Sequence, residues 1–417
     1  MDNRENYGRT GMKILIVNSL YPPDVIGGAE ISTYKLACEL LRRGNEVHVL
    51  TTGQTDSDED YEGVCVHRRL FKNIESFWDF KHDKLIRRVI YKIIDYYNIL
   101  NSKIIKDVID AIGPEVLHTN NIYGITPVIW KIAKKNNIPI VHTLRDYYLI
   151  CPKANLMKRS GNICKCGNFI CKVFRIYYRH LSNNVEAVTA PSQYTLNQFL
   201  NVGYFKNASK EVIYNAVDYD SAEIHKKALQ RKKGQIKREI HVAYVGALLE
   251  TKGVQVLLEA IDEAPENFYF HFAGRGKLEK DVVSAAEKNT HIKYHGFLNE
   301  VELSALLDKV DALICPSIWP EPFGRVVIDA YKACIPVIAT DSGGLPELID
   351  NGVTGMIIEP NSKDAIVDSL KKLNEGYFTH NSIDTIEEKL TDFSIAAQGE
   401  KFYNLFSHVI NENKQHL

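Results

Sequence analysis

Short apolar runs alternate along the chain with longer segments whose apolar residues recur at helical spacing. The first run is KILIVN, residues 13–18, and the next is VHVL, residues 47–50. Between them, Ile31, Tyr34, Cys38 and Leu41 predict a helix, and Gly44 stands where its C-terminal cap belongs. Strands that are almost wholly apolar suit a parallel sheet covered on both faces. The start of the chain therefore predicts a strand–helix–strand unit.

The same alternation continues toward the end of the chain. Further strands are predicted at residues 116–118, 138–143, 187–190, 241–246, 268–274, 292–296, 312–317, 336–340 and 355–359. Helices are predicted at residues 254–261, 278–288, 301–307 and 324–333. A polar, Lys-rich stretch at 222–239 separates two such series. The pattern indicates the α/β class, with two doubly wound domains and a ligand site in the cleft between them.

Composition narrows the function classes. The chain has 417 residues, with 51 Lys+Arg against 52 Asp+Glu, a balance that argues against nucleic acid as a partner. The polar start lacks the apolar segment of a secretory signal, no apolar run is long enough to span a membrane, and the 8 cysteines are expected to be reduced. We therefore expect a cytoplasmic protein. The first βα turn lacks G-x-G-x-x-G, which disfavours a nicotinamide dehydrogenase.

Four predicted strand ends in the second half carry glycine beside a charged residue. They lie at Gly246, at Gly274, at residues 316–324 and at residues 341–347. Glycines let a ligand approach the backbone, and a following helix N-terminus favours an anion. As a set, these loops predict a site for a phosphorylated ligand. Each one alone is equally well explained as an ordinary turn.

Two carboxylates follow the fourth strand of the second series. Glu321 stands between Pro320 and Pro322, which stiffen the backbone and aim the side chain. Asp329 lies eight residues further on, in the predicted helix after Gly324. At that spacing the two acids can contact two parts of one extended ligand. The alternative is that Glu321 is an acid favoured by the helix dipole.

At this point the chain resembles a known family. PSIWPEPFGRVVIDA, PVIATDSGGLPELIDNGVTGMIIEP and VAYVGALLETKGVQVLLEAI in the second half, with KILIVNSLYPPDVIGGAE and VHTLRDYYLICP in the first, resemble family 4 glycosyltransferases. The resemblance spans residues 12–360. It implies the GT-B fold, two Rossmann-like domains facing a central cleft, with acceptor bound by the N-terminal domain and nucleotide-sugar by the C-terminal one.

The resemblance also implies domain boundaries. We expect a flexible extension at residues 1–11, an N-terminal domain at 12–210 and a C-terminal domain at 211–395. A final helix at about 396–417 is expected to pack back on the first domain.

The resemblance assigns roles to individual residues. Glu321 would contact the transferred sugar, and Asp329, where many relatives have Glu, the ribose. Lys252 would neutralise the diphosphate, although Ala247 stands where relatives often carry a second cation. The backbone amides that cradle the phosphates would be those of Phe323, Gly324 and Arg325, with Gly27 and Gly28 closing over the donor.

Arg145-Asp146 stands where many relatives have His-Asp. Arg145 stays protonated and cannot act as a base, but it could hold diphosphate or sugar oxygens. Asp146 is the expected active-site acid. His142 is three residues earlier, on the opposite face of its strand, and a core histidine is the competing interpretation. His118 is a weaker candidate on the acceptor side.

Four cysteines, Cys151, Cys164, Cys166 and Cys171, fall within a short segment. Four thiolates can hold a structural zinc ion. The spacing is not the paired C-x-x-C form, so separate reduced thiols are an equal alternative and disulfides a third. No cofactor is expected to be required for catalysis.

Residues 81–109 carry an apolar stripe with lysines and arginines around it. A basic amphipathic helix can lie on an anionic membrane, while core packing with a solvated charged face is the commoner use. A lipid-linked acceptor would favour membrane contact.

The sequence thus predicts a retaining, hexosyltransferase-type enzyme that moves sugar from a nucleotide diphosphate to a saccharide or lipid-linked acceptor. Cell-surface polysaccharide or glycolipid biosynthesis is the expected setting, in the cytoplasm or at the inner face of the membrane. The alternatives are a GT-B nucleotide-sugar epimerase and a non-catalytic sugar-nucleotide-binding subunit.

Overall fold

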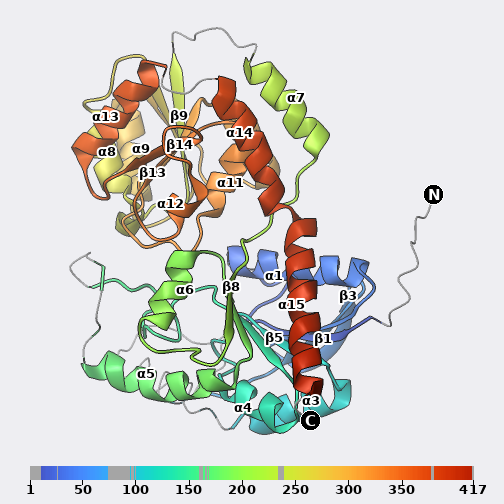
Figure 1. Ribbon diagram of the computed structural model, residues 1–417. Helices are drawn as coiled ribbons and strands as arrows, with labels where there is room; N and C mark the ends of the chain where they lie inside the picture. The colour runs from blue at the N-terminus through green and yellow to red at the C-terminus, as the bar shows by residue number, and fades with distance from the viewer. Residues whose placement is uncertain are drawn as a thin grey trace.

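The computed structural model describes residues 11–25, 27–73, 94, 98, 100–158, 163–164, 167, 169–232, 239–376 and 380–415. In this part of the chain two α/β domains lie one above the other, with the C-terminal domain at the top of Figure 1. The long helix α15 runs down from the upper domain along the lower one (Figure 1). The predicted class and the two parallel-sheet, Rossmann-like domains are confirmed.

The N-terminal domain is built on a sheet in the order β3-β4-β2-β1-β5-β6-β7-β8. Its strands are β1 (Lys13–Val17), β2 (Glu46–Thr52), β3 (Ser57–Tyr61), β4 (Val64–Arg69), β5 (Val116–Thr119), β6 (Ile140–Thr143), β7 (Ala187–Ala190) and β8 (Ser209–Val212). β3 pairs antiparallel with β4, and the other pairs are parallel. Its helices are α1 (Gly28–Arg42), α3 (Ser102–Ile112), α4 (Val128–Lys135), α5 (Phe169–Leu181) and α6 (Gln193–Leu200).

The C-terminal domain has a parallel sheet in the order β11-β10-β9-β12-β13-β14. Its strands are β9 (Ile240–Val245), β10 (Phe268–Ala273), β11 (Ile292–Tyr294), β12 (Ala312–Cys315), β13 (Val337–Thr340) and β14 (Gly355–Ile358). Its helices are α7 (Ser221–Lys232), α8 (Val254–Ile261), α9 (Glu279–Lys288), α10 (Glu300–Leu307), α11 (Arg325–Lys332), α12 (Leu345–Leu348), α13 (Lys363–Asn374) and α14 (His380–Leu390). The strand order reverses between β9 and β12, and such a switch point is where open α/β sheets bind ligands.

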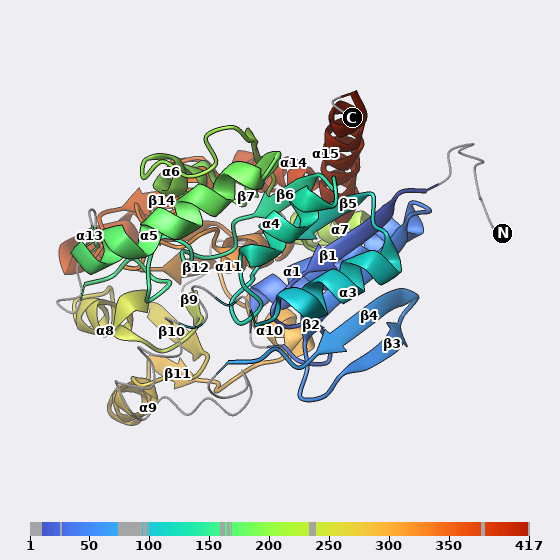
Figure 2. The same ribbon diagram turned by 90° about the horizontal axis from the view of Figure 1, so that it is seen from below.

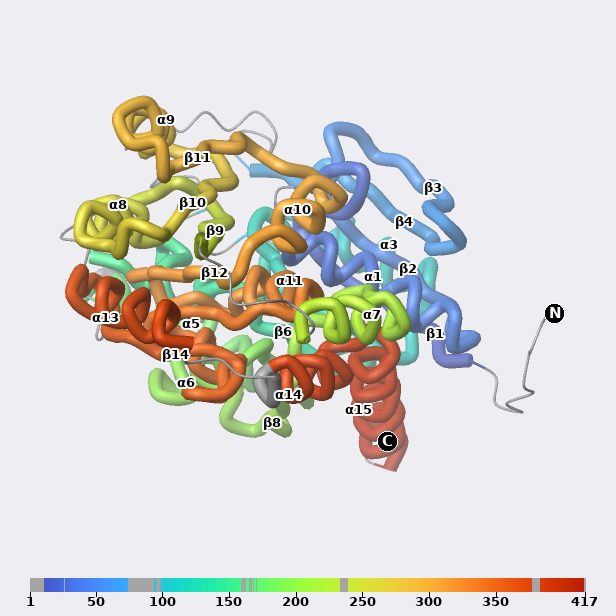
Figure 3. Tube along the Cα trace, turned by 90° about the horizontal axis from the view of Figure 1, so that it is seen from above, coloured from blue at the N-terminus to red at the C-terminus, as the bar shows by residue number. Residues whose placement is uncertain are grey.

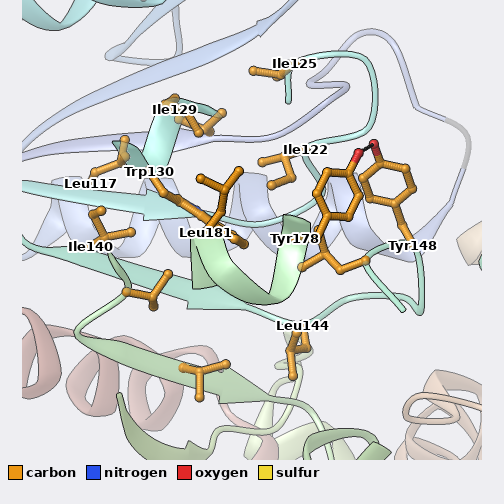
Figure 4. Packing of buried hydrophobic residues seen from close by; sticks show 14 of the residues in the cluster. Leu117, Ile122, Ile125, Ile129, Trp130, Ile140, Leu144, Tyr148, Tyr178 and Leu181 are labelled. Atoms are coloured by element: carbon orange, nitrogen blue, oxygen red, sulfur yellow. Dashed lines mark hydrogen bonds between the residues drawn. The ribbon is translucent and has the colours of Figure 1, made fainter. Parts of the chain in front are cut away.

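The apolar strands of both sheets are buried on both faces, whereas the polar edge strand β3 is exposed. In β1, Leu15 and Val17 pack into one hydrophobic cluster, while Ile14 and Ile16 pack into another on the opposite face. Figure 4 shows the first cluster, in which Trp130 of α4 and Leu181 of α5 close over the sheet. Because successive side chains of a strand point to opposite faces, one apolar strand contributes to the hydrophobic core on each side of the sheet.

The last helix, α15 (Ile395–Gln415), returns to the N-terminal domain. Its Phe402 and Phe406 are fully buried in the same cluster as Leu36 and Leu40 of α1. Seen from above, α15 begins beside α14 and α7 and projects from the edge of the C-terminal domain (Figure 3). The chain thus crosses between the domains twice.

The Lys-rich stretch at 222–239 is not the seam between domains that its composition predicts. As far as it is described, it forms α7, which buries Ile224 and Ala228 in the C-terminal core. Arg231 donates to the carbonyl oxygens of Leu307, Val310 and Ala333. Two apolar positions are enough to anchor α7, so a helix that packs on the core can still have a Lys-rich sequence that is typical of a linker. The first sheet continues to Val212.

The amphipathic segment 81–109 lies mostly outside the described residues. Its described end is not continuous helix, because Leu100 is in a turn and α3 begins only at Ser102. In the described part of the chain, no helix has both the length and the apolar character needed to cross a membrane.

Candidate functional site

One wall of the candidate site is the loop between β12 and α11, which carries Glu321. The Lys252 ammonium lies 2.5 Å from Glu321 Oε1, and the Ser317 hydroxyl donates to the same oxygen over 2.9 Å. Both members of the Lys252–Glu321 ion pair are largely, but not fully, buried. The cation expected to hold diphosphate and the acid expected to hold sugar are therefore in direct contact.

Trp319 places this ion pair against the other domain. The Lys252 ammonium lies 4.5 Å from the centre of the Trp319 ring, within the range of a cation–π interaction. The indole N–H of Trp319 donates to the carbonyl oxygen of Asn155 over 2.8 Å. Lys252 is thus oriented by a carboxylate and an aromatic face together.

Glycines fix the loop by letting backbones touch. A Cβ on Gly253 would lie 1.9 Å from the Pro316 carbonyl oxygen, and one on Gly343 would lie 2.2 Å from that of Glu321. Both glycines have positive φ, 72° and 67°. The Gly344 N–H donates to the Glu321 carbonyl over 2.7 Å. The Glu321 backbone is therefore clamped by a neighbouring strand end.

Gly246 and Gly274 end the adjacent strands β9 and β10. A Cβ on Gly274 would lie 1.8 Å from the Gly246 carbonyl oxygen, so a side chain there is excluded. Beside them, the Arg275 guanidinium lies 5.8 Å from the ring centre of Phe297, a strongly exposed side chain. This edge offers an open backbone with a cation and an aromatic face next to it.

The residues at the start of α11 separate into structural and cleft-facing roles. Phe323 is buried against Tyr214 and Phe393, and Gly324, with φ 107°, caps the helix where Leu345 leaves no room for a Cβ. These two residues are the structural ones.

Arg325 and Asp329 instead line a cavity of about 150 Å³ between α10, α11 and Lys35 of α1. Arg325 pairs with Glu300 over 2.9 Å and lies 4.0 Å from Asp329. Burial raises the pKa of Asp329, and Arg325 partly opposes that shift.

The other wall of the candidate site, in the N-terminal domain, is a buried polar network around Arg145. Its Nε donates to Asn120 Oδ1 over 3.1 Å, and its Nη1 donates to the Ser32 hydroxyl over 3.1 Å and to Asn215 Oδ1. In the described chain, Arg145 Nη2 and Asn120 Nδ2 are buried without a hydrogen-bond partner. The guanidinium thus joins α1, the end of β5 and the segment between the domains.

Asp146 and Glu30 supply the negative charge of this wall. Burial lowers the pKa of Arg145 to about 10, with Glu30 opposing the shift. Burial also raises the pKa of Asp146 to about 6, and Glu30 adds to that rise while the Tyr148 N–H opposes it. Glu30 thus acts on both groups, because it favours the charged form of Arg145 and disfavours the charged form of Asp146.

Gly27 and Gly28 lie at the start of α1, beside Glu30. The Glu30 carboxylate accepts the Gly27 N–H over 2.7 Å, which caps the helix. A Cβ on Gly28 would meet no atom within 4 Å in the described chain, and φ of Gly27 is an ordinary −156°. Among the described residues, nothing requires glycine at these positions, which is the pattern expected where something else approaches the backbone.

Tyr147 joins the two walls. It follows Asp146 directly, and its hydroxyl donates to the Pro320 carbonyl oxygen, next to Glu321, over 3.0 Å. Further along, the Ser192 hydroxyl donates to the Pro322 carbonyl over 2.6 Å. The segment that carries Arg145 and Asp146 is thus docked on the loop that carries Glu321.

His142 and His118 are core residues. His142 bonds to the Thr119 hydroxyl over 2.8 Å and stacks on Phe205, and burial lowers its pKa to about 3. The prediction that His118 lines the acceptor side is wrong, because its ring is fully buried beneath Phe402 and Phe406 of α15. A helix from the far end of the chain covers it.

The cysteine cluster is only partly described. Cys151 and Cys164 are free thiols, Cys171 lies at the start of α5, and Cys166 lies outside the described residues. Within the described ranges no group of three or more His, Cys, Asp or Glu side chains is arranged to hold a metal ion. The zinc site, which needs Cys166, stays a prediction.

Sequence reasoning missed the residues that position the charged groups. Ser317, Trp319 and Tyr147 lie inside the quoted motifs but carry no charge. Glu30 and Asn215 are distant from Arg145 in sequence and meet it only through the fold. The capping pattern at Gly27 could have indicated Glu30, because an acid three residues into a helix commonly caps it.

Comparison with protein families covers both domains. Residues 26–221 match the family model described as Glycosyltransferase Family 4, and residues 226–389 match the one described as Glycosyl transferases group 1. Together these two matches span both walls of the cleft.

Individual proteins agree with that comparison. The chain is 30% identical to an uncharacterized 42.6 kDa protein in the cps region of Klebsiella pneumoniae, over 81% of this chain and 87% of that one. The fold of the present chain resembles that of Anabaena HepE in complex with UDP, with a TM-score of 0.65 at 18% identity over 95% of this chain and 100% of that one. The fold also resembles that of the lipopolysaccharide outer core galactosyltransferase WaaB, with a TM-score of 0.64 at 16% identity over 95% of this chain and 99% of that one.

Proposed function

Because the chain belongs to the family 4 glycosyltransferases, we propose that its cleft binds a nucleotide-diphosphate-sugar and transfers the sugar with retention of configuration. The observation that carries this proposal is the ion pair of Lys252 with Glu321, held at the carboxyl end of β12 and docked on Tyr147. A cation and a carboxylate that lie side by side at one site can each bind a different part of the same ligand. Lys252 takes the diphosphate and Glu321 the sugar hydroxyls.

The diphosphate leaving group develops negative charge as its bond to the sugar breaks. Fixed positive charge and oriented N–H groups aimed at such a group are usually the largest catalytic contribution. Lys252 and the N-terminus of α1 at Gly27 and Gly28 supply them. The Gly246–Gly274 edge and the N-terminus of α11 complete the nucleotide side, with Arg325 and Asp329 in the cavity beside α10.

The N-terminal wall takes the sugar and the acceptor. Arg145 Nη2 is buried without a hydrogen-bond partner in the described chain, while Nε and Nη1 of the same guanidinium are held by Asn120 and Ser32. A cation held in this way binds sugar or diphosphate oxygens without losing its position. Asp146 is the active-site acid, and the acceptor is a saccharide or a lipid-linked saccharide. HepE was solved with UDP, and WaaB is a lipopolysaccharide galactosyltransferase, which favours a UDP-hexose donor and polysaccharide or glycolipid synthesis.

The test starts from the donor. A panel of nucleotide-sugars is screened by thermal shift, because a ligand that binds only the folded state raises the melting temperature. The stabilising donor then enters a transfer assay with Glu321→Gln, which keeps the side-chain shape. We expect the transfer rate to fall by about 10²–10³, with an unchanged melting temperature.

The matched control is Glu250→Gln, an exposed acid two residues from Lys252, which should transfer at the parent rate. Parental transfer by Glu321→Gln would contradict the proposal. Turnover of the nucleotide-sugar without any acceptor would instead identify an epimerase, and donor binding without turnover a binding subunit.

A further inference from the structure

Helix α5 presents an apolar stripe to solvent. Phe169 is 79% exposed, Ile176 is 57% exposed and Val173, between them, is 48% exposed. Spacings of four and three residues place these side chains on one face of the helix. The opposite face, with Tyr178 and Leu181, is buried in the core, as Figure 4 shows. The outer stripe therefore exposes much of its apolar surface to solvent.

The sequence that carries this stripe is basic. Between Asp146 and Glu186 the chain has seven Lys or Arg residues and no carboxylate, in a protein whose formal net charge is −1. Lys172 and Arg179 are exposed on α5, one helical flank away from Phe169. The neighbouring helix α4 adds the exposed Lys131 and Lys135, while its Lys134 pairs with Glu186.

The two helices share one face of the molecule. α4 and α5 are in contact, and Figure 2 shows them side by side on the face turned toward the viewer. Exposed apolar side chains bordered by cations are the composition of a helix that lies in the interface of an anionic bilayer, with its apolar side in the acyl boundary. Each lysine or arginine near such a surface adds attraction.

We propose that the α4–α5 face docks on a membrane containing anionic lipid. The stripe inserts Phe169, Val173 and Ile176, while Lys172 and Arg179 contact the head groups. The same segment of chain reaches the cleft, where the Asn155 carbonyl accepts the Trp319 N–H. If the proposed function holds with a lipid-linked acceptor, this placement brings the acceptor to the cleft from the docked side. The docking itself does not require transfer.

The test is co-sedimentation of the full chain with vesicles, without any sugar donor. One set mixes phosphatidylglycerol with phosphatidylcholine, and the other is phosphatidylcholine alone. We expect binding to the anionic set that weakens as salt is added. The double variant Phe169→Ser/Ile176→Ser should lose about tenfold in partitioning. Lys172→Gln and Arg179→Gln should each lose about fivefold.

Matched controls distinguish a specific role of the α4–α5 face from the general effect of losing an exposed apolar side chain or a cation elsewhere on the surface. Val301→Ser removes an equally exposed apolar side chain on α10, 79% exposed, and Lys372→Gln removes an exposed cation on α13. Both should bind vesicles as the parent does, and all variants should keep the parent melting temperature. Equal binding to both vesicle sets, or full binding by both kinds of α5 variant, would overturn the proposal. So would a change in oligomeric state caused by the α5 variants, because a second copy would then cover the stripe.

Discussion

The C-terminal wall of the cleft holds its charges on rigid backbone, whereas the N-terminal wall holds them in a buried network. Glu321 and Lys252 neutralise each other on a loop clamped by Gly253 and Gly343. Arg145 instead depends on hydrogen bonds that it donates to three separate parts of the chain. On the first wall, a side chain can be changed with little effect on its support. On the second wall, the support and the functional group are the same atoms.

This difference predicts that substitutions on the two walls fail in different ways. Changes to the charged side chains of the C-terminal wall should alter binding or rate in a folded protein. Changes to the charged side chains of the N-terminal wall should also alter stability, because they leave buried partners unpaired or remove buried charge.

The largest expected loss of stability follows Arg145→Ala. It leaves Asn120, Ser32 and Asn215 without their shared donor and Glu30 without a nearby cation. Breaking a buried charged network of this kind costs about 3–5 kcal/mol. Denaturant unfolding measures the change, with Arg42→Ala as control. Arg42 also pairs with an acid, but its side chain is 68% exposed, so the control should lose no more than about 1 kcal/mol. Parental stability of Arg145→Ala would show that the network does not support the fold.

Two glycine substitutions sharpen the comparison within the donor site. Gly343→Ala forces a Cβ toward the Glu321 carbonyl at positive φ and should cost about 2–4 kcal/mol of stability. Gly28→Ala has open space in the described chain and should leave stability nearly unchanged. If diphosphate approaches the start of α1, however, Gly28→Ala should weaken nucleotide binding severalfold. Thermal unfolding and calorimetry of both variants provide the test, and a Gly28→Ala protein that binds nucleotide normally would remove this residue from the site.

A smaller effect, of opposite sign, is expected at Asp146. Its pKa is raised from 3.8 to about 6, so the folded state holds a proton that the unfolded state releases between these values. Stability should therefore rise as pH falls from about 6 to about 4. Asp146→Asn removes the buried charge and should be more stable than the parent at pH 7 by about 1–2 kcal/mol. That advantage should disappear near pH 4, as melting temperatures across this range would show. A variant less stable than the parent at pH 7 would contradict the assigned environment.

The sequence predicts the C-terminal half better than the N-terminal half, for the same physical reason. Local sequence patterns reveal the strand ends at Gly246 and Gly274 and the proline-flanked Glu321. Such patterns arise because close backbone approaches require particular residues at particular positions. The network of Glu30, Asn215 and Arg145 has no such sequence pattern, because its members are brought together only by the fold. His118 shows the same limit, since nothing near it in sequence indicates that α15 will cover it. The α7 helix escaped prediction because two apolar positions sufficed to anchor it.

The central claim is that Lys252 holds the diphosphate and Glu321 holds the sugar. The most direct measurement is calorimetric affinity of the parent, Lys252→Ala and Glu321→Gln for the donor found by thermal shift and for its bare nucleotide diphosphate. Losing a charge-assisted contact costs about 1.5–3 kcal/mol, so Lys252→Ala should weaken both ligands by about 10–100-fold. Glu321→Gln should weaken only the ligand that carries the sugar. Equal loss of both ligands in Glu321→Gln, or unchanged binding of the nucleotide diphosphate in Lys252→Ala, would contradict the claim.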